Sequence, residues 1–190
     1  RYGRPGFPRL LHSIASTWSQ NRNSLEVHAN ELTTYLSDVS NTVPAAGNVT
    51  AFTLDKVNER LKSQFDDQYG GFGGAPKFPH TEQLEYLLSR FSASYKSTEP
   101  PLQALYQLSL TLTRMAEGGL FDQVGGGFYR YSVDEYWMIP HFEKMLYDNA
   151  LLTELYLEAY QATQHLPYAT IAREIIDYVS RDLKSPEGLF

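Results

Sequence analysis

The stretch Phe65–Asp66–Asp67–Gln68–Tyr69–Gly70–Gly71–Phe72 has a counterpart further along the chain, Phe121–Asp122–Gln123–Val124–Gly125–Gly126–Gly127–Phe128. The two copies are offset by 56 residues, measured either from Phe65 to Phe121 or from Gly70 to Gly126. Each copy is followed by a proline–histidine pair, Pro79–His80 or Pro140–His141, and then by apolar residues at helical spacing. Glu187–Gly188–Leu189–Phe190 begins a third copy. A repeat of this length with two helices per unit is typical of helical hairpins.

Such hairpins cannot bury their apolar faces alone, so neighbouring hairpins must stack. Stacking can produce an open solenoid or a closed ring, and chance similarity between two glycine-rich loops would produce neither. Glycine permits a positive φ and close backbone approach, and its clusters recur at the same place in each unit. We therefore predict an all-α fold in which helical hairpins form part of an (α/α)6 toroid, with the loops gathered at one rim.

Outside the loops, the spacing of apolar residues predicts helices and no strand, apart from local pairing around residues 128–133. Thr53 is the predicted N-cap of the third helix. The predicted helices are Pro8–Gln20, Ser24–Val39, Leu54–Phe65, His80–Tyr95, Pro100–Ala116, Pro140–Thr163 and Pro167–Leu183. Residues 1–50 are then connector helices, and residues 51–190 are the first part of an α/α barrel, incomplete and with about three hairpins.

The composition narrows the classes of function. A net charge of −6 argues against a nucleic-acid surface, which needs a basic excess. The chain has no apolar run of the roughly 20 residues that a membrane span requires. No signal pattern opens it, which favours an intracellular location without naming an organelle. Aromatic residues make up 14% of the chain, which suits either bulky packing or a cavity walled by aromatic faces, as in sugar-binding clefts.

The predicted helix that starts at Pro140 carries the main chemical candidates. At about 100° per residue, His141 and Asp148 share an apolar face, where an unpaired charge is costly. They are either a satisfied core histidine and a structural carboxylate, or an acid–base pair at the inner end of a barrel helix. Glu143 projects outward from a regular helix and reaches the rim only if the first turn is irregular.

The loops supply the remaining candidates. Arg130 and Asp134 suit a structural ion pair or a substrate clamp, and Trp137 suits a sugar-stacking wall or a plug of the barrel end. The predicted catalytic residues are His141, Asp148, Arg130 and Glu143. The predicted substrate-binding residues are Tyr131, Asp134, Trp137, Lys77, His80 and Asp122. No metal site and no cofactor are expected, because the glycine runs lack a phosphate-loop lysine and no His/Glu spacing suits a metal.

Several long strings resemble the spermatogenesis-associated protein 20 / YyaL family. The strings are Tyr69–Gly70–Gly71–Phe72–Gly73–Gly74–Ala75–Pro76–Lys77–Phe78–Pro79, Gly119–Phe128, Arg130–Asp134 and Pro140–Ala150. The resemblance implies an N-terminal thioredoxin-like domain, absent here, joined to a six-hairpin barrel similar to N-acylglucosamine 2-epimerases. Tyr129 stands where the family often has histidine, which weakens any role that needs an imidazole there.

Two functions follow from these observations. The first is a fragment of a carbohydrate-active barrel of epimerase or glycosidase type, with a sugar or glycan as ligand. The alternative is a noncatalytic barrel that binds a glycan or a protein and is coupled to a thioredoxin-like redox module, while a plain helical scaffold would bind no ligand. We expect this chain alone to have little or no catalytic activity and to self-associate through uncovered apolar faces. Neither a nucleic-acid partner nor a membrane is expected.

Overall fold

The computed structural model describes residues 5–41, 50–94 and 101–190, which fall into two compact units, residues 1–49 and 50–190. In the first unit, α1 (Phe7–Gln20) and α2 (Arg22–Ser40) form a hairpin that turns at Asn21. Neither helix has a buried residue, and an apolar face of α1 that includes Leu11, Ile14 and Trp18 is exposed. The assignment of this hairpin as a connector stays a prediction.

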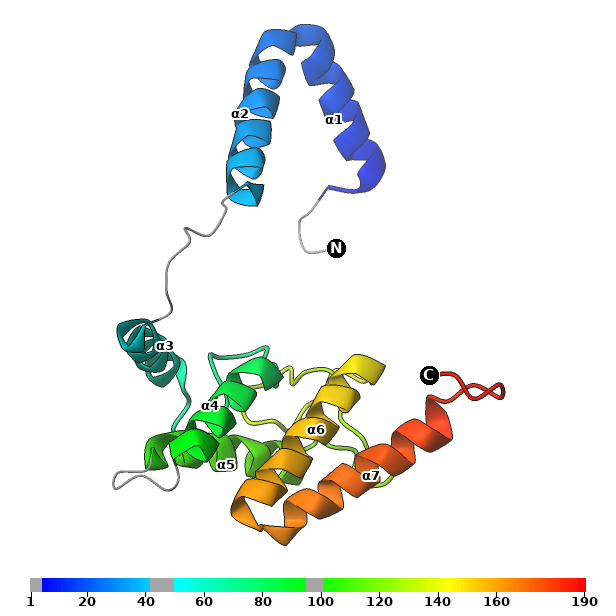
Figure 1. Ribbon diagram of the computed structural model, residues 1–190. Helices are drawn as coiled ribbons and strands as arrows, with labels where there is room; N and C mark the ends of the chain where they lie inside the picture. The colour runs from blue at the N-terminus through cyan, green and yellow to red at the C-terminus, as the bar shows by residue number, and fades with distance from the viewer. Residues whose placement is uncertain (1–4, 42–49, 95–100) are drawn as a thin grey trace. The chain divides into compact units, whose positions relative to one another are not determined.

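The second unit consists of helices and loops (Figure 1). Its helices are α3 (Ala51–Gln64), α4 (Thr81–Ser94), α5 (Leu102–Glu117), α6 (Leu146–Thr163) and α7 (Leu166–Asp182). Helix α4 packs against α5 and α6, and α6 packs against α7. The described residues form isolated β-bridges but no strand. Within these residues, no helix has the length and apolar character to cross a membrane.

Most predicted helices are confirmed to within three residues, although the predicted ends at Tyr95 and Pro100 lie outside the described residues. The cap of α3 is Thr50 rather than Thr53: the Thr50 side chain accepts a hydrogen bond from Thr53 N at 3.4 Å. The prediction of a helix from Pro140 is wrong, because α6 begins only at Leu146.

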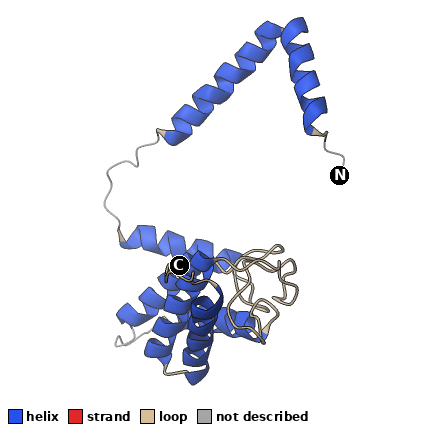
Figure 2. Ribbon diagram, turned by 90° about the vertical axis from the view of Figure 1, so that its right-hand side faces the viewer, coloured by secondary structure: helices blue, strands red, loops and turns tan. Residues whose placement is uncertain are grey.

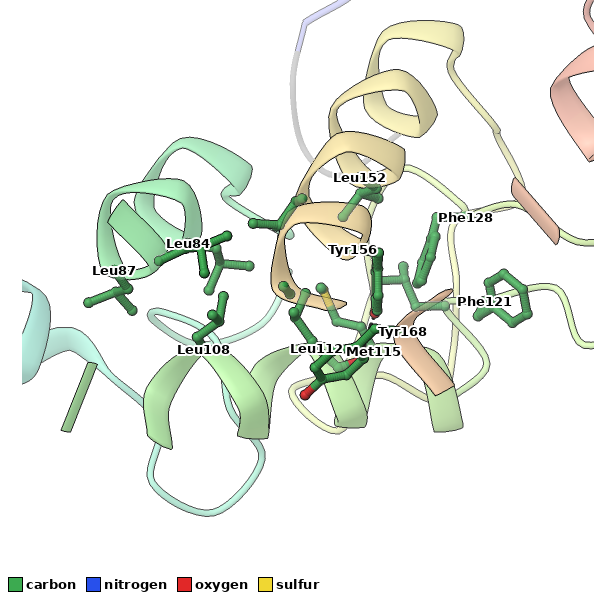
Figure 3. Packing of buried hydrophobic residues seen from close by; sticks show 14 of the residues in the cluster. Leu84, Leu87, Leu108, Leu112, Met115, Phe121, Phe128, Leu152, Tyr156 and Tyr168 are labelled. Atoms are coloured by element: carbon green, nitrogen blue, oxygen red, sulfur yellow. Dashed lines mark hydrogen bonds between the residues drawn. The ribbon is translucent and has the colours of Figure 1, made fainter. Parts of the chain in front are cut away.

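The core of the second unit is formed where α4, α5, α6 and α7 meet (Figure 3). Leu84 of α4 and Leu108 of α5 are fully buried, as is Leu152 of α6. Tyr156 is buried too, and its ring stacks on Phe128 at 5.5 Å while its hydroxyl donates to Leu112 O at 2.6 Å. The core thus joins the helices to the second glycine-rich loop.

The two glycine-rich loops have the same internal structure. In each, the phenylalanines at the two ends form a β-bridge, Phe65 with Phe72 and Phe121 with Phe128. The aspartate that follows the first phenylalanine accepts two loop amides through Oδ1 and a lysine ammonium through Oδ2. These lysines are Lys77, 2.6 Å from Asp66, and Lys144, 2.8 Å from Asp122. The repeat seen in the sequence is therefore a repeat of conformation.

The glycines dock the loops onto equivalent helices. Gly70 and Gly126 have φ values of 71° and 76°. A Cβ on Gly70 would lie 2.8 Å from Thr111 Cα on α5, and a Cβ on Gly126 would lie 2.7 Å from Glu174 O on α7. At these two positions glycine is needed both for the left-handed backbone and for the close approach.

The two loops lie at the same end of the helices, as predicted. Lys77 N donates to Ser132 O at 2.8 Å, and Ser132 N donates to Lys77 O at 2.9 Å. The Trp137 indole N–H also reaches back to Tyr69 O at 2.8 Å. Figure 2 shows these loops gathered beside the helices of the second unit. We call this loop end the rim.

Candidate functional site

A small backbone platform forms the outer part of the rim, and it explains why α6 begins late. The chain from Arg130 to Val133 runs antiparallel to residues 139–143. Arg130 N donates to Glu143 O at 2.8 Å, and His141 N donates to Tyr131 O at 2.9 Å. Because the carbonyls of Ile139 and Glu143 and the amide of His141 bond to residues 130–133, this segment does not form the hydrogen bonds of a helical turn. The predicted local pairing near residues 128–133 is confirmed.

Three rings form a continuous stack on this platform. The Tyr131 ring stacks on His141 with centroids 4.7 Å apart and planes 18° apart. The Tyr131 ring also stacks on Phe78, with centroids 4.7 Å apart and planes 29° apart. His141 lies outside any helix, with 46% of its side chain exposed, so the expectation of a buried imidazole on an apolar helix face is wrong. The stack presents a phenol and an imidazole at the surface of the rim.

Glu143 links two basic side chains of the platform. Its Oε2 lies 3.4 Å from Arg130 Nη1 and 3.5 Å from His141 Nδ1. The expected Arg130–Asp134 ion pair is therefore replaced by Arg130–Glu143. Glu143 precedes α6, which begins at Leu146, so it is not part of a helix. Its side chain reaches the rim, as expected for an irregular first turn.

Asp148 lies in the first turn of α6, next to this group. Burial raises the pKa of its carboxyl above the ordinary value, an effect that the Arg130 charge opposes and the Glu143 charge reinforces. Its Oδ2 is shielded from solvent and has no hydrogen-bond partner. Asp148 is thus a carboxyl held toward its neutral, proton-donating form.

Two other predicted substrate-binding residues hold the loops instead. Lys77 is fully buried, and besides Asp66 its ammonium donates to Glu135 O at 3.0 Å. The Asp122 carboxylate accepts the amides of Val124 and Gly125, and the amide of Gly125 together with Lys144 lowers its pKa to about 2. Both side chains are occupied by loop contacts, so the structure gives them a structural role.

Asp134 and Trp137 also build the rim rather than face a ligand. The Asp134 carboxylate accepts the backbone amides of Tyr136, Met138 and Ile139, which closes a tight loop. Trp137, at the centre of that loop, has a φ of 67° and is fully buried. Trp137 therefore has no exposed face in this structure, and its packing agrees with the alternative of a plug rather than with a sugar-stacking wall.

His80 is the last of the predicted residues, and it remains at the rim. Its side chain is partly exposed, and its ring centroid lies 6.3 Å from that of Phe78. His80 therefore borders the ring stack without joining it. The structure brings together His141, Tyr131, Arg130, Glu143 and Asp148, with His80 at the edge.

Sequence reasoning missed three residues that position this group. Phe78 supports the stack, and Lys144 holds the second loop through Asp122 and Gly126 O. Asn149 is buried in α6 and bonds both backbone groups of Phe128, accepting from N at 2.7 Å and donating to O at 3.0 Å. The repeat offered one signal for Lys144. Each loop aspartate needs a cation, and a lysine follows each loop in the sequence.

Comparison with known proteins finds relatives by sequence and by fold. No protein-family model matches the sequence. Spermatogenesis-associated protein 20 of Mus musculus is 39% identical over 193 residues, which cover 98% of this chain and 24% of that protein. Its counterpart in Homo sapiens is 38% identical over 194 residues, again 98% of this chain and 24% of the relative. The chain thus spans about a quarter of the length of the curated relatives it matches.

Two solved structures share the fold. A sugar epimerase from a ruminal bacterium matches with a TM-score of 0.56 and 16% identity, over 70% of this chain and 36% of that one. Cellobiose 2-epimerase from Bacillus thermoamylovorans matches with a TM-score of 0.54 and 22% identity, over 73% of this chain and 39% of that one. Helical hairpins of this chain therefore form part of an (α/α)6 toroid. Along nearly all its length, the chain is therefore similar in sequence to about a quarter of spermatogenesis-associated protein 20.

Proposed function

We propose that this chain contributes one side of a carbohydrate site at the rim of an (α/α)6 toroid. The observation that carries the proposal is the stack of the partly exposed Tyr131 on the exposed His141 ring, with Glu143 Oε2 3.5 Å from the imidazole. An aromatic face matches the apolar C–H face of a sugar ring, and nearby charged groups match its hydroxyls. The likeness to two sugar epimerases supports the proposal at the level of the fold.

The rim groups suit proton transfer. Histidine is a common general acid or base, and the Glu143 carboxylate, 3.5 Å from Nδ1, would orient the His141 ring for that role. Removing a proton next to a sugar carbonyl and returning it to the opposite face would invert one carbon. Asp148, with a raised pKa, suits the donor role, and Arg130 suits the oxygen that gains negative charge.

A glycosidase reading uses two of the same residues. Glycoside hydrolysis needs one protonated and one ionised carboxyl, which Asp148 and Glu143 would supply. The alternative is a noncatalytic barrel that binds a glycan or a protein through the ring stack, coupled to the thioredoxin-like redox module that the family resemblance implies. In that case the stack binds and the carboxyls transfer no proton.

Ligand-observed NMR on the purified chain tests the binding step. We expect saturation transfer from the protein to at least one of cellobiose, glucose, mannose and N-acetylglucosamine, with dissociation constants of about 1–10 mM for a one-sided site. Tyr131→Leu and His141→Gln should abolish the transfer. His28→Gln, an exposed histidine of α2, is the matched control and should leave it unchanged.

A second measurement separates the catalytic and noncatalytic forms, and it uses a protein of the relatives' full length, because this chain alone is expected to have little or no activity. Incubation in deuterated water followed by mass spectrometry detects exchange at a carbon-bound sugar position, and the release of monosaccharide detects hydrolysis. Exchange or hydrolysis that Glu143→Gln removes supports the enzyme, and binding without either supports the alternative. Silence of every sugar, with Tyr131→Leu folded and equally stable, would refute the carbohydrate site.

A further inference from the structure

A second pocket lies away from the rim, between α3, α4 and α5. Its volume is about 220 Å³. The glycine-rich loops adjoin the start of α4 and the end of α5, whereas this pocket adjoins the later part of α4 and the start of α5. Its polar lining includes Asn58, Glu59 and Lys62 from α3, Arg90 from α4, and Gln103 and Gln107 from α5. None of these residues belongs to the proposed sugar site.

Gln107 is the feature that indicates a ligand. The residue is only 3% exposed, and its Nε2 is shielded from solvent without any hydrogen-bond partner. Buried amide donors are almost always satisfied, since leaving one unpaired costs free energy. An acceptor in this pocket would satisfy the donor once the Gln107 amide rotates toward it.

The charged side chains around Gln107 favour a negatively charged acceptor. Lys62 and Arg90 bring two cations to the pocket, against one carboxylate from Glu59. The start of α5 adds two amides: Ala104 N and Leu105 N donate to Pro101 O, whereas the amides of Leu102 and Gln103 have no acceptor within the helix. The positive end of the helix dipole and these amides favour an anion.

From these observations we propose that the pocket between α3, α4 and α5 binds a phosphate group, either as the free ion or as the monoester of a small metabolite. The guanidinium of Arg90 and the ammonium of Lys62 neutralise the charge, and the Gln107 amide and the first turn of α5 donate to the oxygens. Glu59 opposes binding, so the affinity is modest. The site lies apart from the rim and makes no use of its groups.

Titration of the chain with inorganic phosphate, followed by isothermal calorimetry and by the thermal midpoint, tests the proposal. We expect saturable binding and a rise in midpoint with phosphate concentration. Arg90→Gln, Lys62→Gln and Gln107→Met should each weaken binding, by about tenfold where a charge-assisted hydrogen bond is lost. Glu59→Gln should tighten it. Arg114→Gln, an exposed cation of α5 outside the pocket, should change nothing.

Glucose 6-phosphate and acetate complete the experiment. Binding of inorganic phosphate alone identifies the free ion as the ligand, whereas tighter binding of glucose 6-phosphate identifies a monoester, and both outcomes support the site. Acetate at equal ionic strength should bind at least tenfold more weakly. The proposal is overturned by the absence of saturable phosphate binding, by equal loss in Arg114→Gln, or by undiminished binding in Gln107→Met. Sugar binding at the rim is scored separately with Tyr131→Leu.

Discussion

Replacement of Lys77 by methionine measures how much the buried ion pair of the first loop stabilises the second unit. Lys77 is fully buried, and its ammonium lies 2.6 Å from an Asp66 oxygen and 3.0 Å from Glu135 O. Removing one partner of a buried pair costs about 3–5 kcal/mol, because the other charge is left uncompensated. Asp66 keeps two amide donors, and a fifth of its side chain is exposed, so we expect a loss of about 3 kcal/mol.

Urea unfolding followed by tryptophan fluorescence is the assay. The chain has two tryptophans, so a Trp18→Phe background leaves Trp137, in the second unit, as the reporter. Lys144→Met is the matched variant: Lys144 and its partner Asp122 are 11% and 24% exposed, so its loss should cost less, about 1–2 kcal/mol.

The double variant Asp66→Asn with Lys77→Met should regain part of the lost stability, since it removes the orphaned charge. The reasoning would be refuted if the free energy of unfolding of Lys77→Met lay within about 0.5 kcal/mol of that of the Trp18→Phe parent. Differences of this size are typical of neutral surface substitutions.

Four more outcomes are expected. Gly126→Ala should cost more than 2 kcal/mol in urea unfolding and Gly73→Ala only about 1 kcal/mol, since both have a positive φ but only Gly126 faces backbone; equal losses would contradict the docking role. Asp148→Asn should raise or preserve the thermal midpoint at pH 7 while weakening proton transfer to a sugar. Because the native pKa of Asp148 is raised, the parent should gain stability relative to this variant as the pH falls through that pKa. A sharp loss in the midpoint of Asp148→Asn would instead assign Asp148 to packing. Asp122 has a native pKa of about 2, below the ordinary 3.8, so its contribution of up to about 2 kcal/mol, reduced by solvent screening, is complete above about pH 5 and lost as the pH falls to about 1. Acid titration of Asp122→Asn should show a shallower loss of stability over this window. The exposed apolar faces of α1 and α2 should produce self-association and binding of a hydrophobic dye, and a clean monomer by light scattering with little dye binding would contradict this expectation.

The sequence predicted the helices and the repeat because both depend on local periodicity and on glycine spacing. It failed at residues 140–145, where Pro140 is a plausible first helical residue. There the decisive interaction is the pairing of His141 and Glu143 with Tyr131 and Arg130, which joins backbone groups that periodicity does not connect. Tertiary pairing thus overrode a good local helix signal.

The candidate site was predicted only in part, because tertiary contacts also decide which side chains face outward. The residue types at the rim were recognisable from the sequence, but whether each faces a ligand or the protein depends on three-dimensional partners. Trp137 and Lys77 carry attractive chemistry, yet both are fully buried against loop atoms. Phe78 shows the reverse case, since only the folded rim places it beside Tyr131.

The lysine that neutralises each loop aspartate comes from a different distance along the chain. Lys77 lies 11 residues after Asp66, whereas Lys144 lies 22 residues after Asp122. The same electrostatic clamp therefore closes over segments of unequal length. The loop segment between the aspartate and the lysine can differ in length and sequence while the ion pair is kept. Residues 129–143, which include the rim platform, therefore lie in a segment whose length the clamp does not fix.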